Sequence, residues 1–214
     1  MKMTIQIAIS LFLIVACNAP TVNEQRTESS KNVQIKLVDS LGQVTLSVPD
    51  RYDTVLSWVN HSDCGKPCDE QEYRCQPKTL AITKESGFFW RGEPKDSVDR
   101  FTISHSSYIR YRSDDTEMDS LRHKYLKLQI VNNSDSPVIV YDTIEKVGDR
   151  YFSIFVIQRS DTIHNIRVLA VTTINGNEVK FRYDLLSKKD DLTEKNFIKN
   201  SLDLIHTIRI SKGM

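Results

Sequence analysis

This sequence of 214 residues lacks the features that most directly assign a function. Its longest apolar run falls short of the roughly 20 residues that a membrane-spanning helix needs. The 29 basic and 28 acidic residues nearly cancel, so no net field would attract nucleic acid. It contains no phosphate-binding glycine loop, no G-x-S-x-G and no H-E-x-x-H. The sequence therefore gives no basis for assigning an enzymatic activity, a cofactor or a metal.

Histidines are also few, and none of the five lies in a catalytic motif. His105 stands beside Ser104 and Ser106, a neighbourhood that invites a nucleophile hypothesis. A triad is built in space, however, and adjacency along the chain is no evidence for one.

The first sixteen residues have the pattern of an export signal. Lys2 precedes an apolar run from about Ile5 to Ala16, which is typical of a secretory h-region. The run stops at Cys17, and the small or apolar residues directly before that cysteine resemble the bacterial lipobox. This resemblance implies cleavage before Cys17 and attachment of lipid to its sulfur and freed amine. A plain secretory signal with an incidental Cys17 is the alternative.

Lipid on Cys17 would place the protein in the bacterial cell envelope, facing the periplasm or the exterior. Each buried CH₂ contributes about 0.8 kcal/mol, so several acyl chains hold a protein at a membrane stably. Residues 17–32 are almost wholly polar and are predicted to form a flexible tether. Residues 33–214 then form a single domain of ordinary length. We expect an envelope protein or a small ligand as its partner, and no nucleic acid.

Period-two alternation predicts antiparallel strands. Val33–Val38 and Gln43–Val48 form one predicted hairpin, and Asn175-Gly176 signals a tight type I′ turn after Ile166–Ile174. On the return strand, Val179, Phe181, Tyr183 and Leu185 share one face, and Lys180, Arg182 and Asp184 share the other. Further strands are predicted at Thr54–Val59 (or a short helix), Lys78–Thr83, Gly87–Arg91, Arg100–Arg112, Val138–Thr143 and Arg150–Gln158.

Two segments have helical periodicity instead. In Asp114–Asn133, apolar residues recur at three- and four-residue steps, with Asp114 and Glu117 as a capping box. A second helix is predicted from Asp190 onward, and Thr207–Ile210 is either its end or a last strand. The predicted stripes are Met118, Leu121, Tyr125 and Leu128 in the first helix, and Phe197, Ile198, Ser201, Leu202 and Ile205 in the second. The predicted fold class is α+β, a mainly antiparallel sheet with helices packed on it.

The run VLAVTTINGNEVKFRYDLL, followed by a helix and the ending NSLDLIHTIRI, resembles the PsbP-like family. In that family a curved antiparallel sheet lies between helices, and the last helix leads into a short apolar-basic finish. The resemblance covers roughly Tyr151 to Ile210. It implies a curved sheet and a binding or accessory module in preference to an enzyme.

The segment from His61 to Cys75 contains three of the four cysteines. His61, Cys64, Cys68 and Cys75 would supply the four ligands of a structural zinc, and thiolates also suit copper(I). A thiol-redox centre usually has C-x-x-C at a helix start, whereas three residues separate this pair. Thiol-redox chemistry or copper and zinc handling at this loop is the alternative function.

An oxidising envelope favours a disulfide over either alternative. Three cysteines in the mature domain leave one over. Cys64–Cys68 is the first choice, because a Gly/Pro turn brings their Cα atoms within the about 4.4–6.8 Å that a disulfide accepts. Cys64–Cys75 is the second.

Phe88, Phe89 and Trp90 form the densest aromatic cluster. Large aromatics are enriched at binding hot spots, so this cluster is a candidate binding surface. The competing interpretation is a strand with at least one face in the core. The function predicted from the sequence is a membrane-anchored envelope lipoprotein with a non-catalytic binding or accessory domain.

Overall fold

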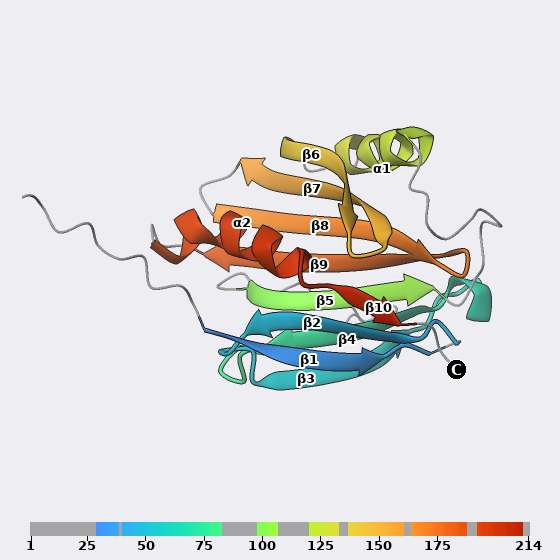
Figure 1. Cartoon of the computed structure of the whole chain (residues 1–214), viewed down its shortest axis with the longest axis horizontal. Helices are drawn as coiled ribbons and strands as arrows, with labels where there is room; N and C mark the ends of the chain where they lie inside the picture. Colours follow the sequence, from blue (N-terminus) through green and yellow to red (C-terminus); the bar gives the residue numbers. More distant parts are fainter. Residues whose placement is uncertain are drawn as a thin grey trace, which may run out of the picture.

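The computed structural model describes residues 29–38, 40–82, 98–106, 120–132, 137–160, 164–187 and 192–211. Within these ranges the chain forms two antiparallel sheets and two α-helices, which confirms the α+β class (Figure 1). The elements are β1 Ser30–Lys36, β2 Gln43–Pro49, β3 Thr54–Asn60, a 3₁₀ turn Lys66–Cys68, β4 Glu70–Gln76, β5 Val98–Ser106, α1 Ser120–Asn132, β6 Val138–Val147, β7 Arg150–Ser160, β8 His164–Ile174, β9 Asn177–Ser187, α2 Leu192–Ile205 and β10 Arg209–Ser211.

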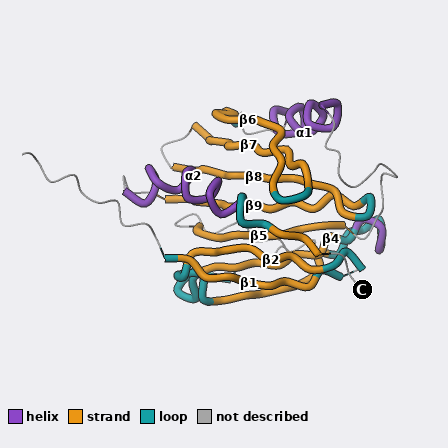
Figure 2. Tube along the Cα trace, in the orientation of Figure 1, coloured by secondary structure: helices purple, strands orange, loops and turns teal. Residues whose placement is uncertain are grey.

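The larger sheet has seven strands in the order β3-β4-β5-β9-β8-β7-β6, and the smaller has the order β1-β2-β10. Most neighbours are joined by hairpins, as Figure 2 shows. The β8–β9 turn has positive φ at Asn175 (48°) and Gly176 (75°), the conformation of the predicted type I′ turn. The pairing of β5 with β9 brings together residues 98–105 and 179–186.

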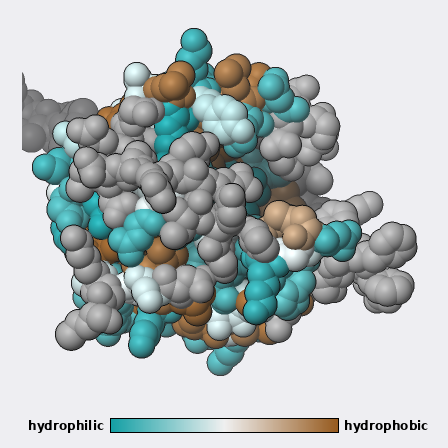
Figure 3. Space-filling view, turned by 90° about the vertical axis from the view of Figure 1, so that its right-hand side faces the viewer, coloured by the Kyte–Doolittle hydropathy of each residue, from teal (hydrophilic) through white to brown (hydrophobic). Residues whose placement is uncertain are grey.

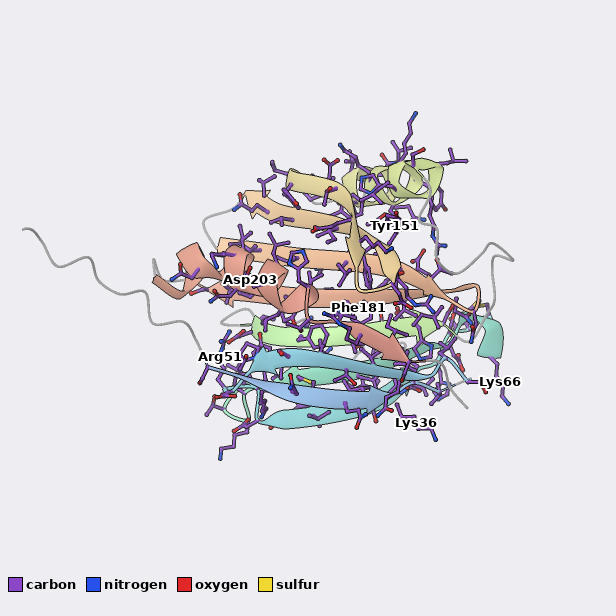
Figure 4. The ribbon with its side chains drawn as sticks, viewed as in Figure 1. Lys36, Arg51, Lys66, Tyr151, Phe181 and Asp203 are labelled. Atoms are coloured by element: carbon purple, nitrogen blue, oxygen red, sulfur yellow. A yellow bond between two sulfur atoms is a disulfide. The ribbon has the colours of Figure 1, made fainter. Side chains whose placement is uncertain are left out.

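The main core lies between one face of the large sheet and a layer made of α2 and the small sheet. Phe152 and Phe181 are almost fully buried there, with ring centroids 5.8 Å apart, and Phe181 is labelled in Figure 4. Each such side chain contributes about 1.5–3 kcal/mol by leaving water. On α2, Phe197, Ser201 and Ile205 are buried, which confirms the predicted stripe.

Helix α1 packs on the opposite face of the large sheet. Phe155, which alternates along β7 with the main-core residues Ile154 and Val156, belongs to a second cluster with Leu126 of α1. The apolar stripe read from the sequence is not the packed face. Leu121 is 74% exposed, and Tyr125 is 54% exposed. Hydrophobic side chains accordingly stand at the surface over the α1 end of the molecule (Figure 3).

Strand β1 begins before the predicted domain boundary. Ser30, Lys31 and Asn32 were assigned to the tether, but they pair with Pro49, Val48 and Ser47 of β2. The Ser47 hydroxyl donates to the Asn32 side-chain oxygen at 2.9 Å. Main-chain hydrogen bonds along an edge strand do not require apolar side chains. The polar composition of residues 30–32 therefore places the predicted start of the domain too late in the sequence.

Strand β4 was not predicted, because EQEYRCQ reads as polar. Its residues alternate: Tyr73 and Cys75 face the main core, while Glu72 and Arg74 are buried as an ion pair on the other face. The strand predicted from Lys78 is wrong in its described part, where residues 78–82 form a turn and loop. The Gln76 amide donates to the Leu80 carbonyl at 3.1 Å and holds that turn.

Candidate functional site

The cysteine loop joins β3 to β4. Cys64 and Cys68 form a disulfide in the structure, with their Cα atoms 5.9 Å apart. Gly65 lies between them with φ of +83°, a left-handed conformation that favours glycine. Figure 4 shows Lys66 of this loop and Arg51 at opposite ends of the sheets. The pairing is the one ranked first from the sequence.

The base of the same loop is closed by Asp69. The backbone N–H of Ser62 donates to one carboxylate oxygen at 2.9 Å, and His61 Nδ1 lies 3.0 Å from the other. The hydrogen bond from Ser62, together with that of His61, lowers the pKa of the Asp69 carboxyl. His61 therefore acts in closing the loop.

Cys75 is not near a metal constellation. It is fully buried in β4, on the core side of the sheet, and burial raises the pKa of its thiol to about 11. Nowhere in the part of the chain that the structure describes do three or more His, Cys, Asp or Glu residues gather as a metal site would require. The hypothetical centre of His61, Cys64, Cys68 and Cys75 is thus not assembled.

Of the remaining candidate residues predicted from the sequence, some lie outside the described part of the chain and the others lie in β5. Cys17 and the cluster Phe88, Phe89 and Trp90 lie outside the described residues. His105 is buried and stacks on Tyr73 with centroids 6.0 Å apart, so it faces the main core. Ser104 and Ser106 point to the other face of β5, because neighbouring strand residues alternate. The arrangement gives no nucleophile–base pair.

The structure instead assembles a layer of charge that sequence reasoning missed. It lies on the face of the large sheet opposite the main core, across β4, β5, β8 and β9. Its members are Glu72, Arg74, Arg100, Arg167, Arg182 and Asp184. The alternation on β9 was visible in the sequence, but only the pairing of β9 with β5 and β8 shows which arginines lie opposite.

Asp184 is the centre of this layer. Its carboxylate lies 2.6 Å from Arg167 Nε, 3.0 Å from Arg182 Nε and 3.3 Å from Arg100 Nε. Burial by itself would raise the pKa of the Asp184 carboxyl, yet the three guanidinium groups hold that pKa well below its usual range. The carboxylate stays ionised, and it fixes side chains from three adjacent strands.

Arg74 extends the layer toward β3. Its guanidinium contacts Glu72 at 3.4 Å and lies over the Trp58 ring, 4.6 Å from the centroid. Burial lowers the pKa of Arg74 to about 10, and the nearby charges of Arg100 and Arg182 act in the same direction. Guanidinium groups are therefore crowded on this face, because Arg74, Arg100 and Arg182 lie close enough to affect one another's charge.

A cavity of about 210 Å³ opens between α1 and this face of the sheet. One part of its lining is apolar: Leu126, Ile130, Pro137, Ile157, Leu169 and Val171. The other part is polar: Gln129, Asn165, Arg167, Lys180 and Arg182. Among the described residues that form the lining, the charged side chains are those of Arg167, Lys180 and Arg182. An apolar wall beside a few polar groups is the usual lining of a small-molecule binding site.

A scan against protein-family models found no match, and a search of curated proteins also found none. Among solved structures, the chain is similar to the solution structure of cyanobacterial PsbP from Synechocystis sp. PCC 6803. That similarity has 10% sequence identity and a TM-score of 0.47, and covers 90% of this chain and 100% of that one. A likeness at this level assigns neither family membership nor function. Neither described α-helix has the length and apolarity to cross a membrane.

Proposed function

We propose that this chain is a membrane-anchored envelope lipoprotein whose α+β domain binds a small ligand in the α1 cavity without catalysing a reaction on it. The observation that carries the proposal is the cavity lining. An apolar wall stands beside fixed polar groups, which is the usual chemistry of a small-molecule site.

The anchor is supported by the lipobox-like sequence before Cys17 and by the place where the domain begins. Strand β1 starts at Ser30, so residues 18–29 connect the lipid-bearing residue to the first strand. Fully extended, that connection would span at most roughly 40 Å. The domain would therefore work close to the membrane, within reach of ligands at its surface.

Membrane fractionation of a Cys17→Ala variant tests the anchor. We expect the parent in the membrane fraction and Cys17→Ala in the soluble fraction, because the variant has no sulfur to acylate. Asn18→Ala is the matched control and should fractionate like the parent. If Cys17→Ala stays with the membrane as the parent does, the lipid anchor is wrong.

The binding function is tested separately, by recording amide NMR shifts of the full-length Cys17→Ala chain. The probes are hexanoate, hexyl phosphate, hexan-1-ol and hexylamine, which share one apolar chain and differ in the charge of the head. We expect at least one probe to shift resonances of α1, β8 and β9, the elements that line the cavity. If no probe shifts them in the folded protein, the cavity is not a ligand site.

A further inference from the structure

We propose that the α1 cavity selects uncharged small molecules, with a polar head hydrogen-bonded by the side-chain amides of Gln129 and Asn165 and a short aliphatic tail against the apolar wall. This inference rests on the proposed binding function and specifies its ligand class. The charged groups of the lining already have protein partners, whereas neither amide has a side-chain hydrogen-bond partner in the described part of the chain.

Two cations of the lining are held by one buried carboxylate. Arg167 Nε lies 2.6 Å and Arg182 Nε 3.0 Å from the carboxylate of Asp184, whose side chain is 8% exposed. The arginines keep the pKa of that carboxyl low, so it remains ionised and paired at neutral pH. A ligand anion would therefore have to compete for the same guanidinium groups with a carboxylate that the fold has already desolvated and positioned.

Lys180, the third cation of the lining, stands beside two carboxylates. Its Nζ lies 3.5 Å from a carboxylate oxygen of Glu178 and 3.9 Å from one of Glu70. An anion at Lys180 would have to replace these contacts, and a cation would meet the positive side chains of the lining. Burying a charge without a partner costs more free energy than burying a neutral polar group. The lining therefore disfavours ligands of either charge.

The neutral polar groups of the lining are the amides of Gln129 and Asn165. Gln129 of α1 is exposed, and Asn165 of β8 is half-buried. Each side-chain amide has two N–H donors and one carbonyl acceptor. The two residues approach the cavity from different elements, and together they can donate to and accept from one uncharged head, such as a carboxamide or a hydroxyl.

The apolar wall receives the tail. Leu126 and Ile130 of α1 line it together with Ile157, Leu169 and Val171 of the sheet. The volume of about 210 Å³ lies below the roughly 300 Å³ at which ligand pockets usually begin, so the tail has to be short. Affinity should rise about fourfold per methylene along the series acetamide, butanamide and hexanamide, because each added methylene leaves water.

NMR titration of the full-length Cys17→Ala chain tests the charge of the head. The probes are hexanamide, hexan-1-ol, hexanoate and hexylamine, which have chains of equal length and differ in the head. We expect hexanamide to bind most tightly and hexan-1-ol next. Hexanoate and hexylamine should bind at least about tenfold more weakly than hexanamide at neutral pH, because their charges would enter the cavity without an uncommitted partner.

Variants test where the head binds. Gln129→Met and Asn165→Leu keep the approximate size of each side chain and remove its hydrogen-bonding groups. Each should weaken hexanamide about threefold to tenfold, the usual effect of losing a neutral hydrogen bond. Asn132→Leu removes an exposed amide of α1 outside the lining, so it is the matched control and should bind as the parent does. Because Gln129 is exposed, Gln129→Met keeps the test valid if Asn165→Leu fails to fold.

The possible failures are distinct. Hexanoate or hexylamine binding as tightly as hexanamide would overturn the selectivity for uncharged ligands and leave the binding function intact. Hexanamide affinity that is unchanged in folded Gln129→Met and Asn165→Leu would place the head elsewhere and overturn this inference as well. No shift in α1, β8 or β9 with any probe would remove both proposals.

Discussion

Arg167 and Asp184 stand directly opposite each other across β8 and β9, and Arg167 Nε lies 2.6 Å from a carboxylate oxygen of Asp184. The carboxylate is shielded on the sheet, whereas the guanidinium reaches the α1 cavity. This ion pair therefore contributes to the stability of the sheet and also positions a guanidinium group in the lining of the candidate site.

Replacing Asp184 with Asn should be strongly destabilising. The substitution leaves the buried guanidinium of Arg100 and those of Arg167 and Arg182 without their shared anion. Breaking a buried pair in this way costs about 3 kcal/mol or more.

Urea unfolding measures the loss of stability in the Asp184→Asn variant, and Asp203→Asn is the control. Asp203 is 59% exposed and pairs with Lys199 one turn away in α2, so its removal should change the free energy of unfolding by roughly 0.5 kcal/mol or less. Equal effects of the two substitutions would refute the buried role of Asp184.

The same carboxylate should make stability depend on pH in acid. Its pKa is lower in the folded protein than in the unfolded chain, so below about pH 4 the unfolded chain binds more protons. The free energy of unfolding contributed by Asp184 is therefore fully present above about pH 4 and declines as the pH falls further. Unfolding curves from neutral pH to about pH 2 should fall more steeply for the parent than for Asp184→Asn. Parallel curves would contradict this assignment.

The packed face of α1 can be identified by a pair of leucine substitutions. Leu126→Ala removes a side chain that is 5% exposed, and should lower the free energy of unfolding by about 2–3 kcal/mol. Leu121→Ala, at a position 74% exposed, is the matched control and should cost roughly 0.5 kcal/mol or less. The reverse order would mean that the stripe predicted from the sequence is the packed face after all.

Cys75 should be chemically silent in the folded protein. Its thiol is fully buried and its pKa is raised to about 11, so almost no thiolate forms at neutral pH. In unreduced Cys17→Ala protein, a colorimetric thiol reagent should find no thiol before denaturation and one afterwards. Rapid reaction of the folded chain would show that Cys75 is accessible.

The Cys64–Cys68 disulfide should have a modest effect, because it closes a very short loop. In the chain-entropy view, a ring of four or five residues stabilises the fold by about 2 kcal/mol. A Cys64→Ser, Cys68→Ser double variant should lose about that much, and the parent under reducing conditions should match it. A stoichiometric metal in the reduced parent would revive the metal hypothesis and contradict a purely structural loop.

Hairpins and the C-terminal helix were predictable because their signals are local. The Asn175-Gly176 turn and the stripe of Phe197, Ser201 and Ile205 were identified correctly from short stretches of sequence. Strand β4 was missed because Glu72 and Arg74 are hidden by pairing with each other and by neighbouring strands. The orientation of α1 was missed because periodicity shows that a helix has an apolar stripe and does not show which side packs.

The sequence alone therefore determined the alternating strands, the α+β class and the disulfide candidates, since these follow from local spacing and residue chemistry. It also carries the lipobox-like pattern before Cys17 on which the anchor proposal depends. Only the tertiary structure decided that Arg100, Arg167 and Arg182 meet at Asp184, because they come from three strands whose order the sequence does not state. The candidate site exists for that reason: its charge is a property of strand pairing, and its apolar wall is a property of where α1 packs.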